Sequence, residues 1–335
     1  MHVAGRTAPE WPRGPERPDV HVLSDNGVPL IRSLGMSRSL AAVASEIRPD
    51  IVHAHWLPEF GWMAARQGLR PLICSAWGSD VLGVRGIGRL RSRRALKSAA
   101  LVFADSSDLA RATRELVEGR VSVEVVRWGL DLVRFSPGEQ DAARKALGLP
   151  LDGRLVVSPR GLKRLYNPEL VLDAFSRVRA QCAEVRLLLK HPGGEMPPEV
   201  KNRIERLGLA DAVVILGGLP FERMVDVYRA ADVVVSIPES DSSPRSVWEA
   251  LACGRPVVVS DLPWVRDELG HDRHALTVPL EADAIAGAIV SVLADDALAA
   301  RLGTGARDLA SAKLNPKACA DRVDALYRRV VAEAR

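Results

Sequence analysis

The sequence has few of the features that mark secreted, membrane-spanning or metal-dependent proteins. Its four cysteines lie far apart and include no Cys-x-x-Cys pair, which favours a reduced, cytoplasmic protein. No window reaches the ~18 uninterrupted apolar residues of a membrane-spanning helix. Residues 1–18 lack the apolar core of a signal peptide, so we expect none. The histidine pairs His53/His55 and His271/His274 have no carboxylate or cysteine at ligand spacing, so we expect no metal site.

A strong positive charge is also missing. The net charge is only +4, so we expect no nucleic-acid partner. No Gly-x-Gly-x-x-Gly motif follows an expected strand, which disfavours a nicotinamide dehydrogenase. The positive charge is nevertheless uneven, because residues 85–97 contain six cations and no acid. This stretch is either a solvated helix face or a patch for anionic lipid headgroups or a phosphorylated acceptor.

Short β-branched runs alternate with amphipathic segments along most of the chain, which predicts a parallel, doubly wound α/β fold. The alternation is interrupted at the turn-rich residues 135–138. We therefore expect an N-terminal domain over 1–136, joined by a C-terminal helix over 316–335, and a second domain over 137–315. Residues 1–18 hold four prolines without periodicity and are expected to be poorly ordered.

One stretch, Ser236 to Asp261, organises the sequence. An apolar strand is followed by a polar loop, and Pro244 fits the first helical position with Ser243 as its N-cap. Gly254 and Pro256 end that helix before the next strand. The unpaired N–H groups at the helix start suit a phosphate, and the Arg245 cation in its first turn fits better with an anion nearby.

Two acids in this stretch, Asp241 and Glu249, lie eight positions apart. One lies in the loop and the other about a turn and a half into the helix, so both can face the carboxyl end of the sheet. Taken alone, they could equally be a solvated loop carboxylate and an exposed helix acid. The Asp-x7-Glu spacing, followed by Ala-Leu-Ala-Cys-Gly-Arg-Pro-Val-Val, resembles the Glu-x7-Glu signature of retaining GT-B glycosyltransferases, specifically glycosyltransferase family 4.

The resemblance implies a GT-B fold, in which two Rossmann-like domains with doubly wound parallel sheets face a cleft. It implies a donor site for a nucleoside diphosphate sugar in the second domain and no further cofactor. The residues that match the donor side of the family are Asp241, Glu249, Arg160, Lys163, Ser242, Ser243, Pro244, Arg245, Gly217, Gly218 and Leu219. Arg160 matches the cation that faces the donor diphosphate, whereas Tyr166 falls where the family usually has Lys, so Lys163 or Arg164 must supply the second charge.

On the acceptor side the resemblance points to His55, Trp77, Gly78 and Asp80. Trp77 stands where a His often precedes the Gly, so it either walls the sugar pocket or fills the core. His55 is a catalytic candidate, although a lone His at a strand end is often a structural residue. Family members usually begin with a full strand, a Gly-rich loop and a long helix, whereas this sequence has only a Pro-rich piece before Val20. We therefore expect either a truncated start or a remnant of that strand at Val3-Ala4-Gly5.

The resemblance therefore implies a metal-independent, retaining hexosyltransferase that transfers a sugar to an acceptor hydroxyl. The expected acceptor is a carbohydrate or a lipid-linked molecule in cell-surface polysaccharide or glycoconjugate synthesis. The expected location is cytoplasmic, with peripheral contact through 85–97 at the inner membrane face. The alternatives are a truncated or degenerate protein that binds sugar nucleotides without transfer, and a GT-B epimerase, which would need more acid/base residues in the first domain.

Overall fold

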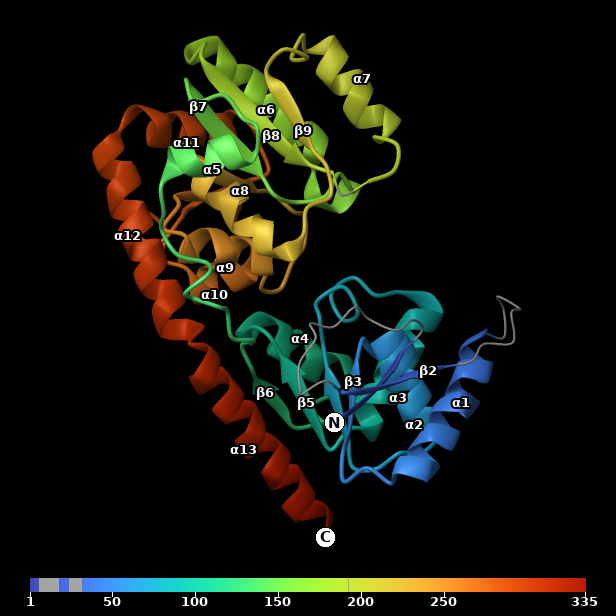
Figure 1. Cartoon of the computed structure of the whole chain (residues 1–335). Helices are drawn as coiled ribbons and strands as arrows, with labels where there is room; N and C mark the ends of the chain where they lie inside the picture. The colour runs from blue at the N-terminus through green and yellow to red at the C-terminus, as the bar shows by residue number, and fades with distance from the viewer. Residues whose placement is uncertain (6–17, 24–31, 192) are drawn as a thin grey trace. The chain divides into compact units, whose positions relative to one another are not determined.

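The computed structural model describes residues 1–5, 18–23, 32–191 and 193–335. Its contacts divide the chain into two compact units (Figure 1). Unit 1 comprises Met1–Val126 and Asp321–Arg335, and unit 2 comprises Arg127–Ala320. The sequence placed these boundaries at 136 and 316, whereas the contacts place them after Val126 and Ala320. Both units are built from parallel sheets, which confirms the predicted α/β class.

The strands of unit 1 form two parallel sheets. A four-stranded sheet has the order β3-β4-β5-β6, and β1 pairs with β2 separately. The bounds are β1 His2–Gly5, β2 Asp19–Val22, β3 Val52–His55, β4 Leu72–Ser75, β5 Leu101–Ala104 and β6 Val123–Val125. The expectation of poor order at the start is wrong for β1, which is fixed by the pairing of His2 with Asp19. The rest of that expectation concerns residues 6–17, which lie outside the described residues.

A cavity of about 820 Å³ lies beside the smaller sheet. Consecutive residues of β1 line it together with residues 50–55, which lead into and form β3. The end of helix α1, His21 of β2 and Tyr327 also line it. The two sheets of unit 1 are therefore separated, in the described part of the chain, by a space that both border.

The helices of unit 1 pack around the larger sheet. They are α1 Arg32–Ile47, the π-helix η1 Leu57–Gly61, α2 Trp62–Arg66, α3 Gly86–Ser98, α4 Ser107–Leu116 and the second half of α13 Pro316–Ala334. Ser106 caps α4 by accepting a bond from the Leu109 N–H at 3.2 Å, as expected for an N-cap serine. The core of this unit includes the fully buried Leu57, Leu72, Cys74 and Leu96.

A buried polar network attaches the C-terminal helix to the sheet of unit 1. His53 on β3 contacts the Tyr327 hydroxyl through Nδ1 at 2.6 Å and the Ser75 hydroxyl through Nε2 at 2.8 Å. Desolvation by burial, with a smaller effect of His55, lowers the pKa of His53 to about 3. The ring is therefore neutral at physiological pH, and each of its nitrogens faces a hydroxyl. On the surface, Glu124 pairs with Arg322 and Arg329 of the same helix.

Unit 2 contains one six-stranded parallel sheet. Its order is β12-β11-β10-β7-β8-β9, the strand order of a Rossmann sheet. The bounds are β7 Arg154–Ser158, β8 Val185–Lys190, β9 Val213–Leu216, β10 Val233–Ser236, β11 Val257–Ser260 and β12 Leu276–Val278. The chain builds β7, β8 and β9 in one direction and then returns to the other side of β7, so the order reverses between β7 and β10.

Helices cover both faces of this sheet (Figure 1). Their bounds are α5 Gln140–Ala146, η2 Arg164–Tyr166, α6 Pro168–Gln181, α7 Pro198–Arg206, η3 Phe221–Arg223, α8 Met224–Ala230, α9 Arg245–Ala252, α10 Pro263–Glu268, α11 Ala282–Ala294 and α12 Asp296–Lys313. One core, around Tyr228, Val247 and Trp264, lies under α5, α8, α9 and α10. The other, around Phe175 and Ile285, lies under α6, α7 and α11.

The amino ends of the two central strands are joined through Asp232. Its Oδ2 accepts a bond from the Leu155 N–H and another from Arg144 Nη2 at 2.7 Å. Arg144 is almost fully buried and also donates to the carbonyls of Ala230, Leu151 and Gly153. Arg154 contacts the other oxygen of the same carboxylate but is 46% exposed. Asp232 therefore has one buried and one exposed arginine partner.

We predict that Arg144→Ala lowers the free energy of unfolding by about 3–5 kcal/mol, because it removes the buried cation that pairs with Asp232 and leaves three carbonyls without this donor. Arg154→Ala is the matched control on the same carboxylate and should cost less than about 1 kcal/mol. Urea-induced unfolding of the three proteins, followed by circular dichroism, measures both changes. Equal losses in the two variants would contradict a special role for the buried pair.

We also predict that unit 1 loses stability on acidification because of His53. The unfolded imidazole takes up a proton near pH 6.5 and the folded one only near pH 3, so stability falls as pH drops through this window. Between pH 6.5 and 5 the loss amounts to about 2 kcal/mol. In His53→Gln, which has no proton to gain, the decline in melting temperature over this range should be shallower than in the wild type. A variant with an unchanged decline would show that another group controls it.

Candidate functional site

The candidate site lies at the carboxyl end of the sheet in unit 2, where the strand order reverses. Ligands of open α/β sheets bind outside the carboxyl ends of the strands at such a switch point. The loop after β7 carries Arg160, and the loop after β10 carries Asp241. Asn167 ties the two loops together, because its amide donates to the Ile237 carbonyl at 3.0 Å.

Arg160 and Asp241 meet directly across the switch point. Arg160 Nη2 donates to Asp241 Oδ2 at 2.7 Å, and its Nη1 donates to the Ser246 hydroxyl at 3.1 Å. The guanidinium lies over the Tyr166 ring, 4.2 Å from its centroid, in cation–π geometry. Tyr166, at the position where the family usually has Lys, thus supports Arg160 from one side.

Two opposing effects act on the pKa of Asp241. Burial raises the pKa of the Asp241 carboxyl, while the Arg160 charge and the Ser242 N–H, which donates to Oδ1 at 3.0 Å, act to lower that pKa. The carboxylate is 16% exposed and Arg160 is 13% exposed. Two opposite charges are therefore held together where water has limited access, and each can bind a polar ligand group only by sharing its partner.

Glu249 lies on α9 and has two partners. The buried Tyr228 hydroxyl donates to Glu249 Oε2 at 2.6 Å, and Arg245 Nε lies 3.3 Å from Oε1. Burial raises the pKa of Glu249, and the Tyr228 hydrogen bond followed by the charges of Arg245 and Lys190 acts in the opposite direction. The Arg160 charge also acts on Tyr228. Glu249 and Tyr228 thus form a hydrogen-bonded pair between α9 and α8, and Arg160 and Asp241 form the other pair of this site.

The start of α9 differs from the prediction. The helix begins at Arg245 with Pro244 as its N-cap, and no side chain caps it. The prediction that Ser243 is the N-cap is wrong, because its hydroxyl accepts a bond from the Trp248 indole at 2.8 Å instead. Gly254 ends the helix as predicted, with a φ of 68° that favours glycine.

Other predicted donor-side residues lie on loops at the same edge. Gly217 and Gly218 follow β9 and are exposed, and a Cβ at Gly217 would meet nothing within 4 Å. Leu219 packs against the core of the sheet. Lys163 is exposed after β7 and forms no ion pair within the described residues. The structure therefore brings Arg160, Asp241 and Glu249 together, but it does not join Lys163 to them.

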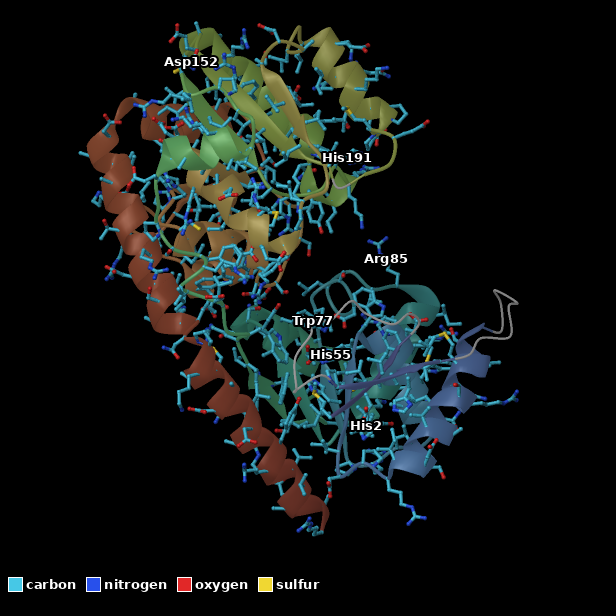
Figure 2. All side chains as sticks on the ribbon, viewed as in Figure 1. His2, His55, Trp77, Arg85, Asp152 and His191 are labelled. Carbon is cyan, nitrogen blue, oxygen red and sulfur yellow. The ribbon has the colours of Figure 1, made fainter. Side chains whose placement is uncertain are left out.

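Two of the predicted acceptor-side residues are neighbours on unit 1. His55 ends β3, and its ring centroid lies 5.6 Å from that of Trp77. Figure 2 shows both side chains beside each other in this unit. Trp77 is 40% exposed, so it does not fill the core. The adjacent Trp56 is 37% exposed and has a φ of 72°, an unusual backbone conformation of the kind that gathers at functional sites.

The other two acceptor-side candidates position this loop. Asp80 is fully buried, and its carboxylate accepts bonds from the N–H groups of Leu57 at 3.1 Å and Trp77 at 2.8 Å. Burial raises the pKa of Asp80, and these backbone bonds act to lower it. Gly78 has a φ of 89°, which favours glycine. Asp80 therefore orients Trp77 and the turn after β3 and is not presented to solvent.

Sequence reasoning missed Tyr228, Tyr166, Ser246 and Lys190. The first three each contact a predicted site residue, Glu249 or Arg160, in the folded protein. No sequence motif predicts these contacts. Lys190 was not singled out because it follows the apolar run 185–189, although β8 continues to Lys190. In the described part of the chain, no group of three or more His, Cys, Asp or Glu side chains is arranged to hold a metal ion.

Solved structures share the fold of the chain. Sucrose-phosphate synthase from Thermosynechococcus elongatus superposes with a TM-score of 0.80 at 22% identity, over 95% of this chain and 87% of that one. The Anabaena protein HepE, solved in complex with UDP, gives a TM-score of 0.77 at 21% identity over 93% and 86% of the two chains. These neighbours confirm the GT-B fold expected from the sequence.

Curated relatives and family profiles agree with this fold. D-inositol 3-phosphate glycosyltransferases from Mycolicibacterium smegmatis and Mycolicibacterium vanbaalenii are 31% and 32% identical, over 63% and 67% of this chain and 52% and 57% of the relatives. The chain thus spans about half the length of these relatives. Residues 1–129 match the family described as Glycosyl transferase 4-like domain, and residues 139–309 match Glycosyl transferases group 1. The chain belongs to the group 1 glycosyl transferases.

Proposed function

We propose that the chain is a retaining glycosyltransferase that moves a hexose from a nucleoside diphosphate sugar to an acceptor hydroxyl. The observation that carries this proposal is the Arg160–Asp241 pair at the switch point, together with the Tyr228–Glu249 hydrogen bond between α8 and α9. Structural neighbours solved with UDP and UDP-glucose support a nucleotide-sugar donor. The expected donor is therefore a UDP sugar, with GDP and ADP sugars as the other forms to compare.

In this proposal each residue of the cluster has one task. Asp241 accepts hydrogen bonds from sugar hydroxyls, and Glu249 accepts them from the ribose of the nucleotide. Arg160 and the N–H groups of Ser242 and Ser243 stabilise the diphosphate as its negative charge grows. Tyr228 and Arg245 hold Glu249 in place, since both contact its carboxylate.

The proposed transfer step needs no strong protein base. The acceptor oxygen forms a bond to the anomeric carbon on the face from which the diphosphate departs, while the bond from that carbon to the phosphate oxygen breaks. The acceptor proton passes to the departing phosphate oxygen, so atoms and charge balance. Fixed cations neutralise the leaving diphosphate, a role that a metal ion fills in many other enzymes.

We place the acceptor site on unit 1, at the exposed rings of His55 and Trp77. An aromatic surface beside an imidazole suits a polyol or sugar, which has apolar faces and hydroxyl edges. The curated relatives are named for an inositol phosphate, and we propose a carbohydrate or lipid-linked acceptor used in cell-surface polysaccharide or glycoconjugate synthesis.

Helix α3 supports a peripheral position at the cytoplasmic face of a membrane. Among its cations, Arg91 stacks on Trp62 and Arg93 pairs with Glu118, so both serve the fold. Four others are exposed in or beside the helix, namely Arg85, Arg89, Arg94 and Lys97. Ile87 and Leu90 are 69% and 68% exposed and, by helical spacing, share a face with Arg94 and Lys97. Exposed apolar side chains next to Lys and Arg are typical of a helix that lies at a membrane surface. No helix of the described chain has the length and apolarity needed to span a bilayer.

A second candidate function is a protein that binds sugar nucleotides without transferring the sugar. The separated sheets of unit 1 favour it, because the cavity beside β1 interrupts the unit that carries the proposed acceptor site. The donor cluster in unit 2 would be intact in such a protein. Release of UDP that depends on an added acceptor distinguishes the two functions, because only a transferase produces it.

We predict that Arg160→Ala lowers turnover by about 30- to 1,000-fold, or 2–4 kcal/mol, because it removes the donor to the leaving diphosphate. The assay incubates each UDP, GDP and ADP sugar with a panel of polyol, sugar and lipid-linked acceptors and measures nucleotide release and product mass. Arg179→Ala, which breaks a surface pair with Asp211, is the matched control and should retain full turnover. Turnover of Arg160→Ala within a few-fold of the wild type would refute the role of Arg160.

We predict that Arg94→Glu/Lys97→Glu weakens binding to anionic vesicles. Each cation near such a surface contributes about 1 kcal/mol, so the double variant should bind at least about 30-fold less in a sedimentation assay with phosphatidylserine-containing vesicles. Arg38→Glu/Lys145→Glu carries the same change in net charge at exposed positions elsewhere. If both double variants lose binding equally, the attraction is general and α3 is not the docking surface.

A further inference from the structure

The charges already identified at the donor site cancel one another. Asp241 pairs with Arg160 at 2.7 Å, and Glu249 pairs with Arg245 at 3.3 Å. A nucleoside diphosphate sugar brings two further negative charges, and its leaving group carries a third as the sugar bond breaks. In this site each carboxylate is paired with one arginine, so binding a diphosphate requires an additional cation.

Lys190 lies at the same edge of the sheet as this cluster. It is the last residue of β8, which neighbours β7, and it pairs in register with Leu216 at the end of β9. The following N–H, that of His191, still donates to the Leu216 carbonyl at 2.8 Å, so the backbone at Lys190 is held by the sheet. Figure 2 labels His191 beside the loops where these strands end.

The side chain of Lys190 belongs to the face of the sheet that α8 and α9 cover. Side chains alternate along a strand, and Leu188 packs into the core beneath these helices while Leu187 and Leu189 pack into the opposite one. Lys190 therefore projects on the side of Leu188, towards the helices that carry Tyr228 and Glu249. Its charge reaches Glu249, where it acts to lower the pKa of that carboxyl.

Lys190 has no carboxylate partner of its own. Its side chain is partly exposed, and no described residue forms an ion pair or side-chain hydrogen bond with its ammonium group. Lys163 and Arg164, the two cations expected from the sequence, also form no ion pair within the described residues, but both lie exposed after β7 and neither is held by a strand. A cation on a rigid strand end needs less ordering to meet a ligand than one on an exposed loop.

We propose that Lys190 binds the diphosphate of the donor and supplies the cation that complements Arg160. This inference rests on the proposed function, since it assigns a residue to the same donor site. Arg160 approaches the diphosphate from the β7 loop, and Lys190 approaches it from the end of β8. The ammonium group contacts phosphate oxygens and not the base or the sugar.

The experiment compares binding of UDP and of uridine to the full chain by calorimetry and ligand-observed NMR. Lys190→Met keeps the length of the side chain and removes its charge, so affinity for UDP should fall by about 10- to 100-fold while affinity for uridine is unchanged. Lys190→Arg restores a cation and should recover most of the loss. Lys201→Met removes an exposed lysine on α7 and should bind UDP like the wild type.

The possible outcomes distinguish a wrong assignment of Lys190 from a wrong assignment of the donor site. If the wild type binds UDP, GDP or ADP and Lys190→Met binds the same nucleotide equally well, Lys190 is not a diphosphate ligand and the donor site stands. An equal loss of uridine and UDP affinity in Lys190→Met would also overturn the assignment, because the lost contact would not involve phosphate. If the wild type binds none of the three diphosphates, the proposed function fails together with this inference.

Discussion

The ion pair between Arg160 and Asp241 closes the carboxyl ends of β7 and β10, the two strands at which the order of unit 2 reverses. The amino ends of the same strands are joined by Asp232, which accepts bonds from the Leu155 N–H and from Arg144. The central pair of the sheet is therefore fixed at both ends by a carboxylate and an arginine. At the amino end Arg144 is saturated with backbone carbonyls, whereas at the carboxyl end the pair lies in loops with a hydroxyl and an aromatic ring as its other partners. The Arg144–Asp232 pair therefore stabilises the sheet, whereas the Arg160–Asp241 pair still has groups that can contact a ligand.

Burial sets the electrostatics of the donor cluster. It raises the pKa values of Asp241 and Glu249, and cations and hydrogen-bond donors act against it. An ionised carboxylate in such a site is held in one orientation. If it turned away from its hydrogen-bond donors, it would be a buried charge without partners, which is strongly unfavourable. Hydroxyl and phosphate groups of a ligand can share the donors that already contact Asp241 and Glu249. The two acids then stay paired when the ligand binds. The cluster is therefore preorganised for a polar ligand that shares these hydrogen-bond partners.

The sequence predicted the parallel sheets, the positions of most helices and the convergence of Arg160, Asp241 and Glu249, because these follow from local alternation and from the rule that parallel strands end at one edge. It could not predict partners that tertiary packing supplies. Tyr228 reaches Glu249 from another helix, and the Ser243 hydroxyl bonds the Trp248 indole in place of capping α9. The resemblance offered Val3-Ala4-Gly5 as a strand remnant, and β1 lies there, but its pairing with β2 could not be predicted because four residues carry no usable periodicity. The last residue of β8 was missed because lysine does not continue an apolar run, although the backbone ladder extends past it.

Buried or nearly buried carboxylates occur in both units, and the partners of Asp80 differ in kind from those of Asp241 and Glu249. In unit 1 the two oxygens of Asp80 accept bonds from backbone N–H groups, so this acid is used to shape the loop that presents Trp77. In unit 2 Asp241 and Glu249 contact arginine side chains, whose torsions can change without breaking the backbone. Side-chain partners can be shared with a ligand, whereas backbone partners at a folded loop cannot move without local unfolding. The proposed donor site of unit 2 therefore has side-chain partners that a ligand can share, whereas Asp80 of unit 1 positions the loop that carries Trp77.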